Sequence, residues 1–168
     1  ARALSKIGYL QPTPIQEMVA APMLDGRDVV GQAQTGTGKT AAFGIPLAMM
    51  VNHSNRDVQA LILVPTRELA RQVAAELSRI NEYTGISVCP VYGGAPIVRQ
   101  MDQLRAGCHI VVGTPGRVVD LIQRDSLRLG RVGTVVLDEA AQMLDIGFLP
   151  DIRRILRSTP RERQTALF

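Results

Sequence analysis

The sequence is poor in aromatic residues and contains no tryptophan. Aromatic side chains make up 4% of the 168 residues, although hydrophobic residues of all types make up 46%. The core must therefore be aliphatic, and with only 20% charged residues a disordered chain is excluded. The net charge of +4 is compatible with a polyanionic partner, but the excess is too small to establish one. The length predicts a single domain, residues 1–168.

Cysteine is also scarce. Cys89 and Cys108 lie far apart in apolar segments, with no CxxC or cysteine–histidine pairing, so a zinc site is not expected. Two thiols of this kind are typical of a reducing compartment. The sequence lacks a secretory leader and an apolar run long enough to cross a bilayer. We therefore expect a soluble, cytoplasmic, monomeric chain without membrane contact.

Six short apolar runs alternate with helical patterns. Unalternating Val/Ile/Leu runs are typical of strands buried on both faces of a sheet. Strand alternating with helix predicts an α/β fold, a mostly parallel sheet with helices on both faces and ligands at the carboxyl ends of the strands. The predicted strands are residues 28–31, 60–64, 87–91, 109–113, 133–137 and 165–168. The predicted helices are residues 15–24, 40–51, 68–82, 96–106, 116–123 and 149–158.

A glycine-rich loop follows the first predicted strand and opens a helix. Gly36 and Gly38 let the backbone curl so that successive N–H groups point at an anion, and the helix N-terminus adds partial positive charge. Lys39 suits the β- and γ-phosphates of a nucleotide, and Thr40 suits Mg²⁺. Ala33 stands where the strict phosphate-loop pattern has glycine. The predicted nucleotide-binding residues of this loop are Gln34, Thr35, Gly36, Thr37, Gly38, Lys39 and Thr40.

The predicted strand 133–137 delivers two acids, Asp138 and Glu139, at its carboxyl end. Asp138 is expected to hold Mg²⁺ together with Thr40, and Glu139 to orient or deprotonate an attacking water. Phosphoryl transfer depends on positioning and on charge neutralisation, which these groups and Lys39 can supply. Lys39, Asp138 and Glu139 are therefore the predicted catalytic residues.

Six segments in order resemble the motifs of one family. They are residues 8–16 (Q motif), 33–40 (motif I), 65–70 (motif Ia), 93–94 (glycine doublet), 114–117 (motif Ib) and 138–141 (motif II). With them, almost the whole chain resembles the N-terminal RecA-like domain of a DEAD-box ATP-dependent RNA helicase, within helicase superfamily 2. The resemblance implies a RecA-like P-loop fold, ATP and Mg²⁺ as cofactors, RNA as a partner, and ATP hydrolysis coupled to RNA unwinding.

The Q-motif resemblance implies an adenine site. In the family the motif's glutamine, here Gln16, reads the adenine edge by two hydrogen bonds, and Tyr9 aligns with an aromatic residue that stacks on the base. An amide carries one donor group and one acceptor, which suits the N6/N7 edge of adenine and not that of guanine. Thr13 is expected to cap the helix near Ile15 and to approach the phosphate loop.

The remaining motifs imply contacts to the RNA backbone. Thr66 and Thr114 each precede a predicted helix, where hydroxyl and N–H donors face outward at a positive helix end. Glycines allow a sugar–phosphate strand to approach the protein backbone closely, and the arginines add positively charged guanidinium groups. None of these contacts reads a base, so we expect sequence-independent, salt-sensitive RNA binding. The predicted RNA-binding residues are Pro65, Thr66, Arg67, Gly93, Gly94, Thr114, Pro115, Gly116 and Arg117.

The chain departs from the family pattern at Ala141, where motif II has aspartate. In the family this aspartate links motif II to motif III and to the second RecA-like domain. The sequence ends at Phe168, where motif III would begin, so that domain and its arginine fingers are expected in a longer protein. An arginine finger contributes about 10³–10⁵ in rate. We therefore expect the chain alone to bind adenine nucleotide, to bind RNA weakly, to hydrolyse ATP negligibly and to unwind nothing.

Three alternatives follow from the same residues. A superfamily 2 DNA helicase would share motif I, but the Q-motif segment argues against it. A catalytically impaired, ATP-gated RNA scaffold is supported only by Ala141. A GTP-dependent switch lacks a guanine-reading Asn-Lys-x-Asp and is set aside.

Overall fold

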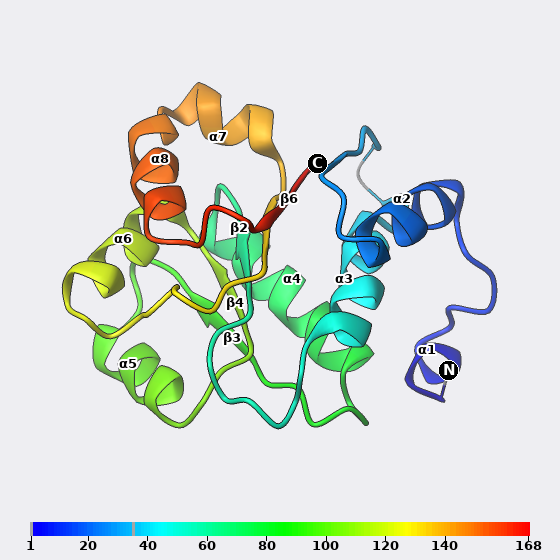
Figure 1. Ribbon diagram of the computed structural model, residues 1–168, viewed down its shortest axis with the longest axis horizontal. Coiled ribbons are helices and arrows are strands. Elements are labelled where there is room, and N and C mark those ends of the chain that lie inside the picture. Colours follow the sequence, from blue (N-terminus) through cyan, green and yellow to red (C-terminus); the bar gives the residue numbers. More distant parts are fainter. Residues whose placement is uncertain (1, 35) are drawn as a thin grey trace.

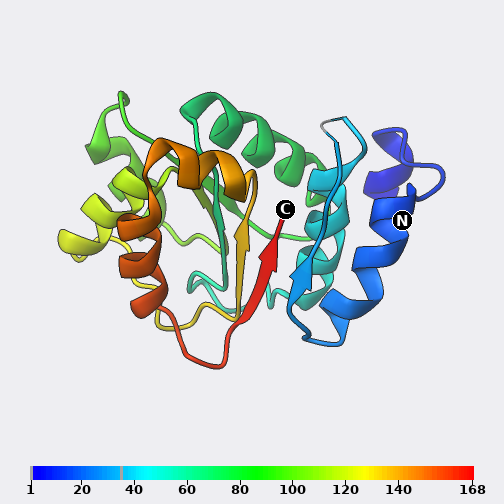
Figure 2. The same cartoon turned by 90° about the horizontal axis from the view of Figure 1, so that it is seen from above.

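Six parallel strands form one sheet at the centre of the computed structural model, which describes residues 2–34 and 36–168 (Figures 1 and 2). The strands are β1 (Val29–Val30), β2 (Ala60–Leu63), β3 (Val88–Val91), β4 (Ile110–Gly113), β5 (Thr134–Leu137) and β6 (Gln164–Leu167). Their order across the sheet is β1-β6-β5-β2-β4-β3. The helices of the described residues are α1 (Arg2–Lys6), α2 (Pro14–Leu24), α3 (Lys39–Met50), α4 (Arg67–Ile80), α5 (Ile97–Arg105), α6 (Pro115–Gln123), α7 (Ala140–Ile146) and α8 (Leu149–Arg157).

Helices cover both faces of this sheet, which confirms the predicted α/β class. Ile62 on the central strand β2 belongs to a core shared with α2, α3 and α4. The next residue, Leu63, belongs to a second core on the opposite face, shared with α6 and α8. Successive side chains of a strand point to opposite faces, and here both faces are buried, so the strand reads as an unbroken apolar run.

Two strands differ from the prediction that all are buried on both faces. β1 has only two residues at one edge of the sheet, and Val30 is 81% exposed. β3 lies at the other edge, where its burial alternates along the strand. Pro90 in β3 is tolerated because an edge strand pairs on one side only, here with β4. An apolar run in the sequence does not show whether its strand lies at an edge.

Short helices account for the remaining difference. α7 follows directly after the acids at the end of β5 and was not predicted, because its seven residues are too few for a periodic apolar pattern. It ends at Gly147, which has a φ of 97° and so adopts the left-handed conformation common after a helix. None of the helices within the described ranges has the length and apolar character that a bilayer crossing requires.

The segments that follow the carboxyl ends of the strands form two neighbouring groups, which the strand order separates. The glycine loop follows β1 and the acid pair follows β5, in the half that contains β6. Thr66 lies just beyond β2, the glycine doublet beyond β3, and Thr114 beyond β4, and these three strands are adjacent. The fold therefore gathers the predicted nucleotide residues on one half and the predicted RNA residues on the other.

Candidate nucleotide and nucleic-acid site

The glycine loop joins β1 to α3 in the predicted strand–loop–helix order. Gly36 and Gly38 have φ of 84° and 83°, values that favour glycine, and Gly38 is the N-cap of α3. The Thr37 hydroxyl donates to the Gln34 carbonyl at 2.6 Å and closes the turn between them. Thr35 lies outside the described residues. This loop forms one wall of a cavity of about 500 Å³.

Lys39 bridges the loop to the acid pair. Its Nζ donates to Glu139 Oε1 at 2.6 Å and lies 3.3 Å from Asp138 Oδ1. Burial of Lys39 opposes its charge, but the hydrogen bond to Glu139 and the charge of Asp138 outweigh this effect and raise the lysine pKa. Burial raises the pKa of Asp138, an effect that Lys39 partly offsets. The predicted catalytic residues are thus brought together.

Asp138 retains a free acceptor. Its side chain is 3% exposed, and Oδ1 has no hydrogen-bond partner among the described residues despite its nearness to Lys39. Thr40, in the first turn of α3, lines the same cavity. A hydroxyl and one carboxylate are hard oxygen donors of the kind that Mg²⁺ takes beside nucleotide phosphates. The donor set therefore fits Mg²⁺, and no cluster of three or more His, Cys, Asp or Glu suited to another metal exists within the described ranges.

Glu139 adopts a strained backbone conformation. Its φ of 55° and ψ of 49° place a residue with a side chain in the left-handed region, at the N-cap of α7. Such strain persists where the surrounding structure holds it, and it concentrates at functional sites. The conformation directs the chain from β5 into α7 while the carboxylate meets Lys39.

Gln16 ties the start of α2 to the glycine loop. Its Oε1 accepts from Thr13 N at 3.0 Å, and its Nε2 donates to the Gly38 carbonyl at 3.2 Å. Thr13 is the N-cap of α2, as expected, but its hydroxyl is buried and has no hydrogen-bond partner among the described residues. A side chain on Gly38 would collide with Gln16 Nε2 and lie 3.2 Å from Thr13 Oγ1. Gln16 and Thr13 therefore lie directly against the glycine loop.

Tyr9 closes the same cavity from the other side. Its hydroxyl donates to Glu76 Oε1 at 2.5 Å, and burial together with this bond raises the pKa of Tyr9 to about 12. Glu76 was not predicted as a site residue. The α4 residues that line the cavity are Leu69, Gln72, Val73 and Glu76. The last three follow Leu69 by three, four and seven positions, so the four residues share one face of α4. This spacing can be read from the sequence.

The residues of the three turns that follow β2, β3 and β4 differ in exposure. Thr66 caps α4 by accepting from Leu69 N at 3.2 Å, whereas Pro65 is buried beneath it. The Arg67 side chain is 61% exposed and pairs with Glu68 at 2.6 Å. Arg67 Nη1 also lies 3.2 Å from the point where a Cβ on Gly94 would stand. Motif Ia and the glycine doublet are therefore neighbours.

At the start of α6 the predicted residues are partly covered. Thr114 is the N-cap, Pro115 is buried and Gly116 is exposed. The Arg117 side chain is only 13% exposed and donates to Gln100 Oε1 at 2.9 Å and to the Ala95 carbonyl at 3.2 Å. Its guanidinium therefore faces the protein rather than solvent.

Comparison with known proteins shows the family of the chain. The model of the DEAD/DEAH box helicase family matches residues 13–168. The chain belongs to this family. It is 53% identical to the DEAD-box ATP-dependent RNA helicase CshA of Geobacillus kaustophilus and 49% identical to that of Bacillus subtilis, over 99% of this chain. It covers 36% and 34% of those proteins, about a third of their length.

Solved structures of the family show the same fold. A DEAD box protein from the hyperthermophile Methanococcus jannaschii superimposes with a TM-score of 0.94 at 42% identity, over 99% of this chain and 46% of that one. A hypothetical ATP-dependent RNA helicase from Sulfolobus tokodaii gives 0.91 at 38% identity, over 99% and 48%. The predicted RecA-like fold is thereby confirmed.

The position that departs from the family pattern lies at the surface. Ala141 is exposed in the first turn of α7, two residues after Glu139.

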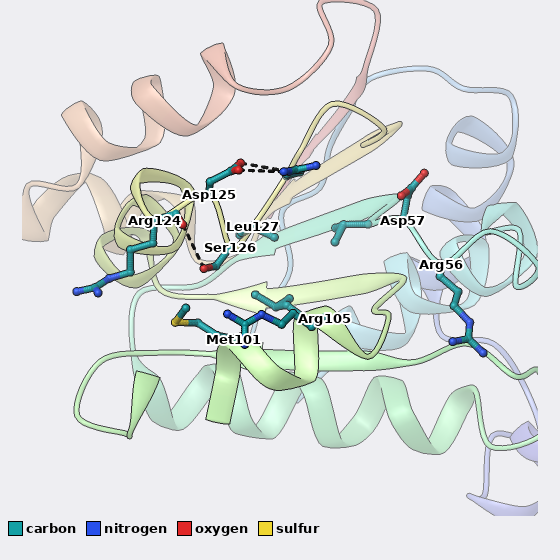
Figure 3. Close-up of a pocket in the computed structure, with 11 residues that line it drawn as sticks. Arg56, Asp57, Met101, Arg105, Arg124, Asp125, Ser126 and Leu127 are labelled. Carbon is teal, nitrogen blue, oxygen red and sulfur yellow. Dashed lines mark hydrogen bonds and ion pairs between the residues drawn. The ribbon is translucent and has the colours of Figure 1, made fainter. Parts of the chain in front are cut away.

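A second hollow, of about 410 Å³, lies at the opposite, amino-terminal edge of the strands (Figure 3). Its rim is rich in arginine, but Arg128 pairs with Asp125 at 2.9 Å and Arg105 with Asp102 at 3.1 Å. Arg105 lies in the last turn of α5, where a cation complements the helix dipole. Arg124 pairs with Asp120 at 2.7 Å, so three of the four arginines that line the hollow, all except Arg56, have a carboxylate partner close in the sequence.

Proposed function

We propose that the chain is the ATP-binding domain of an ATP-dependent RNA helicase. The single observation that carries the proposal is the pairing of Lys39 with Glu139 and Asp138 in the cavity that Tyr9 and Gln16 adjoin. Relatives that match the chain over 99% of its length are named ATP-dependent RNA helicases. Because the chain covers about a third of these relatives, unwinding is proposed for the longer protein.

The nucleotide would lie across the mouth of the glycine loop. Gln16 would read the adenine edge, since its carbonyl oxygen can accept a second hydrogen bond and its NH₂ group has a second donor. Tyr9, held by Glu76, would stack on the base. Lys39 would leave Glu139 for the phosphates, which compete for the same cation. The proposed nucleotide-binding residues are Tyr9, Thr13, Gln16, Gln34, Thr35, Gly36, Thr37, Gly38, Lys39 and Thr40.

Thr40 and Asp138 would hold Mg²⁺. The bound ion would neutralise charge on the phosphates. Glu139 would accept a hydrogen bond or a proton from the attacking water once Lys39 has turned to the phosphates. Hydrolysis by this chain alone is expected to be negligible, because no residue described here supplies an arginine finger from a second domain.

RNA would lie along the turns that follow β2, β3 and β4. The exposed residues Gly93, Gly94 and Gly116 and the exposed Arg67 support contacts to the phosphate backbone. Backbone contacts predict binding that is independent of sequence and weakened by salt. The buried Pro65 and Pro115 would shape this surface from beneath.

RNA-stimulated ATP hydrolysis by the longer protein tests the proposal. Glu139→Gln should reduce the stimulated rate by about 10²-fold or more while RNA still binds. Glu82→Gln, which removes an exposed carboxylate paired with Lys6 far from the cavity, is the matched control. Unchanged hydrolysis in Glu139→Gln, or stimulation by DNA in preference to RNA, would contradict the proposal.

A second candidate is favoured by Ala141 alone: an RNA-binding scaffold that binds ATP but turns it over poorly. Ala141→Asp in the longer protein separates the two functions. A rise in RNA-stimulated turnover would indicate that the alanine reduces coupling in an enzyme. No rise, together with a negligible rate in the unmodified protein, would favour the scaffold.

A further inference from the structure

The turn after β3 contains two glycines at the protein surface. Gly93 and Gly94 are both exposed, and Gly94 has a φ of 79°. No hydrogen-bond acceptor for either N–H occurs among the described residues. A short loop of exposed, unpaired donors can bind an anion, but only if its backbone is held in one conformation.

Two side chains hold this turn from beneath. Gln100 Nε2 donates to the Tyr92 carbonyl at 3.1 Å, and Arg117 Nη1 donates to the Ala95 carbonyl at 3.2 Å. These carbonyls lie immediately before and immediately after the glycine doublet. Arg117 Nη1 also donates to Gln100 Oε1 at 2.9 Å, which joins the two side chains. We call this set of three hydrogen bonds the Gln100–Arg117 bracket.

The bracket lies inside the protein. Gln100 is 5% exposed although it is polar, and both functions of its amide are used within the bracket. Arg117 has Asp120 as its nearest carboxylate, at 3.9 Å, and Asp120 in turn accepts from Arg124 at 2.7 Å. Gln100 and the Arg117 guanidinium are therefore each bound to the turn by a hydrogen bond.

The start of α6 is joined to the same part of the protein as the turn after β3. Thr114 N donates to the Val91 carbonyl at 3.1 Å, which joins the end of β3 to the residue before α6. A side chain on Gly113 would lie 2.6 Å from Val91 Cγ2 and 2.6 Å from Val118 Cγ2, so the two strands meet closely here. Arg117, in the first turn of α6, therefore fixes the doublet relative to the exposed N-terminus of its own helix.

We propose that Gln100 and Arg117 are positioning residues for RNA phosphate binding, acting through the backbone of the Gly93–Gly94 turn rather than by touching RNA. This inference rests on the proposed RNA-binding function and adds to it a residue, Gln100, that lies outside every sequence motif discussed above. It also changes the expected role of Arg117 from a phosphate contact to a support of the turn.

The test measures the affinity of the 168-residue chain for a fluorescein-labelled oligouridine across a range of salt concentrations. Gln100→Met removes no charge, yet should weaken RNA binding by about tenfold because the turn loses its fixed conformation. Arg117→Lys should weaken it to a similar extent, since an ammonium keeps the charge but lacks the planar fork that spans two acceptors. Gln103→Met, an exposed glutamine on the same helix α5, and Arg131→Lys, an exposed arginine between α6 and β5, are matched controls.

A double-mutant cycle shows whether Gln100 and Arg117 act on RNA binding through one shared structure or through independent contacts. Gln100→Met combined with Arg117→Lys should be no weaker than either single variant, because both break one bracket. ADP affinity should be unchanged in each variant, which also shows that the chain is folded. If Arg117 instead binds phosphate directly, Arg117→Lys should retain most of the affinity, and Arg117→Met should reduce the salt slope by about 0.7 and act additively with Gln100→Met.

The outcomes separate the inference from the function on which it rests. RNA binding that is unaffected in both Gln100→Met and Arg117→Lys, or additive losses, would overturn the positioning role and leave the proposed function standing. An unmodified chain that does not bind oligouridine even at low salt would overturn both. Should Gln100→Met fail to fold, Arg117→Lys with unchanged ADP affinity decides the question.

Discussion

Lys39 Nζ lies 2.6 Å from Glu139 Oε1 although 100 positions separate the two residues in the chain. The parallel sheet brings them together, because β1 and β5 flank β6 and deliver their carboxyl ends to one edge. The cation that suits nucleotide phosphates is thus engaged by the carboxylate that suits the attacking water. In the proposed nucleotide complex the phosphates would compete with Glu139 for this cation, and the competition is open to measurement.

Removing the competing carboxylate should tighten nucleotide binding. In Glu139→Gln the neighbour of Lys39 is neutral instead of charged. The phosphates then compete with a weaker interaction for the Lys39 ammonium group. Because Glu139 is partly exposed, the gain should be modest, about threefold to tenfold for ADP without Mg²⁺. Calorimetric titration measures it, and the exposed pair formed by Glu82 supplies the control Glu82→Gln. Weaker ADP binding in Glu139→Gln would show that the pair holds the loop in its binding conformation instead.

Gly38→Ala should abolish nucleotide binding and destabilise the chain. The residue has a φ of 83°, and a Cβ would collide with the Gln16 amide. Left-handed strain alone costs about 1–3 kcal/mol, which urea unfolding detects. Gly130→Ala is the matched control, because a Cβ there meets nothing within 4 Å. Equal stability of the two variants would be incompatible with the observed loop conformation.

Asp138→Asn should stabilise the chain at neutral pH while removing the effect of Mg²⁺. Burial raises the pKa of Asp138, so the stability contributed by its neutral form is present below the unfolded pKa of 3.8 and is lost as pH rises through the folded value. At pH 7 the ionised, buried group therefore opposes folding, and asparagine removes that opposition. Thermal unfolding at pH 7, and ADP titration with and without Mg²⁺, measure the two effects. A less stable variant, or one that still responds to Mg²⁺, would contradict this account.

The Tyr9 phenol should ionise at a higher pH than an ordinary tyrosine in alkaline titration. Its folded pKa of about 12 exceeds the ordinary value of 10.0, because burial and the bond to Glu76 favour the neutral phenol. The corresponding stability is complete below pH 10 and is lost as pH rises toward 12. Tyrosinate absorbance of the native chain minus that of Tyr9→Phe reports this group. A difference signal that rises near pH 10 would show that the phenol is solvated and free of Glu76.

The local parts of the site were predictable from the sequence, and the tertiary parts were not. The strand–loop–helix around Lys39 follows from an apolar run, two glycines and a helix start within a few residues of one another. The contact of Glu76 with Tyr9 depends on how α4 packs against the segment before α2, which periodicity does not report. The inward orientation of Arg117 depends on Gln100, a residue of another helix. The exposure of Val30 depends on β1 lying at the edge of the sheet.

Adenine recognition by Gln16 is the central claim and the one to measure first. The measurement is a calorimetric titration of the chain with ATP, ADP and GTP, with and without Mg²⁺, repeated on Gln16→Glu. Glutamate keeps the acceptor that binds Thr13 N but removes the NH₂ donor. Gln103→Glu on the exposed face of α5 controls for the added charge. We predict adenine-selective binding that loses its selectivity in Gln16→Glu alone. Equal binding of ATP and GTP by the unmodified chain would contradict the claim and leave a phosphate-binding domain without base recognition.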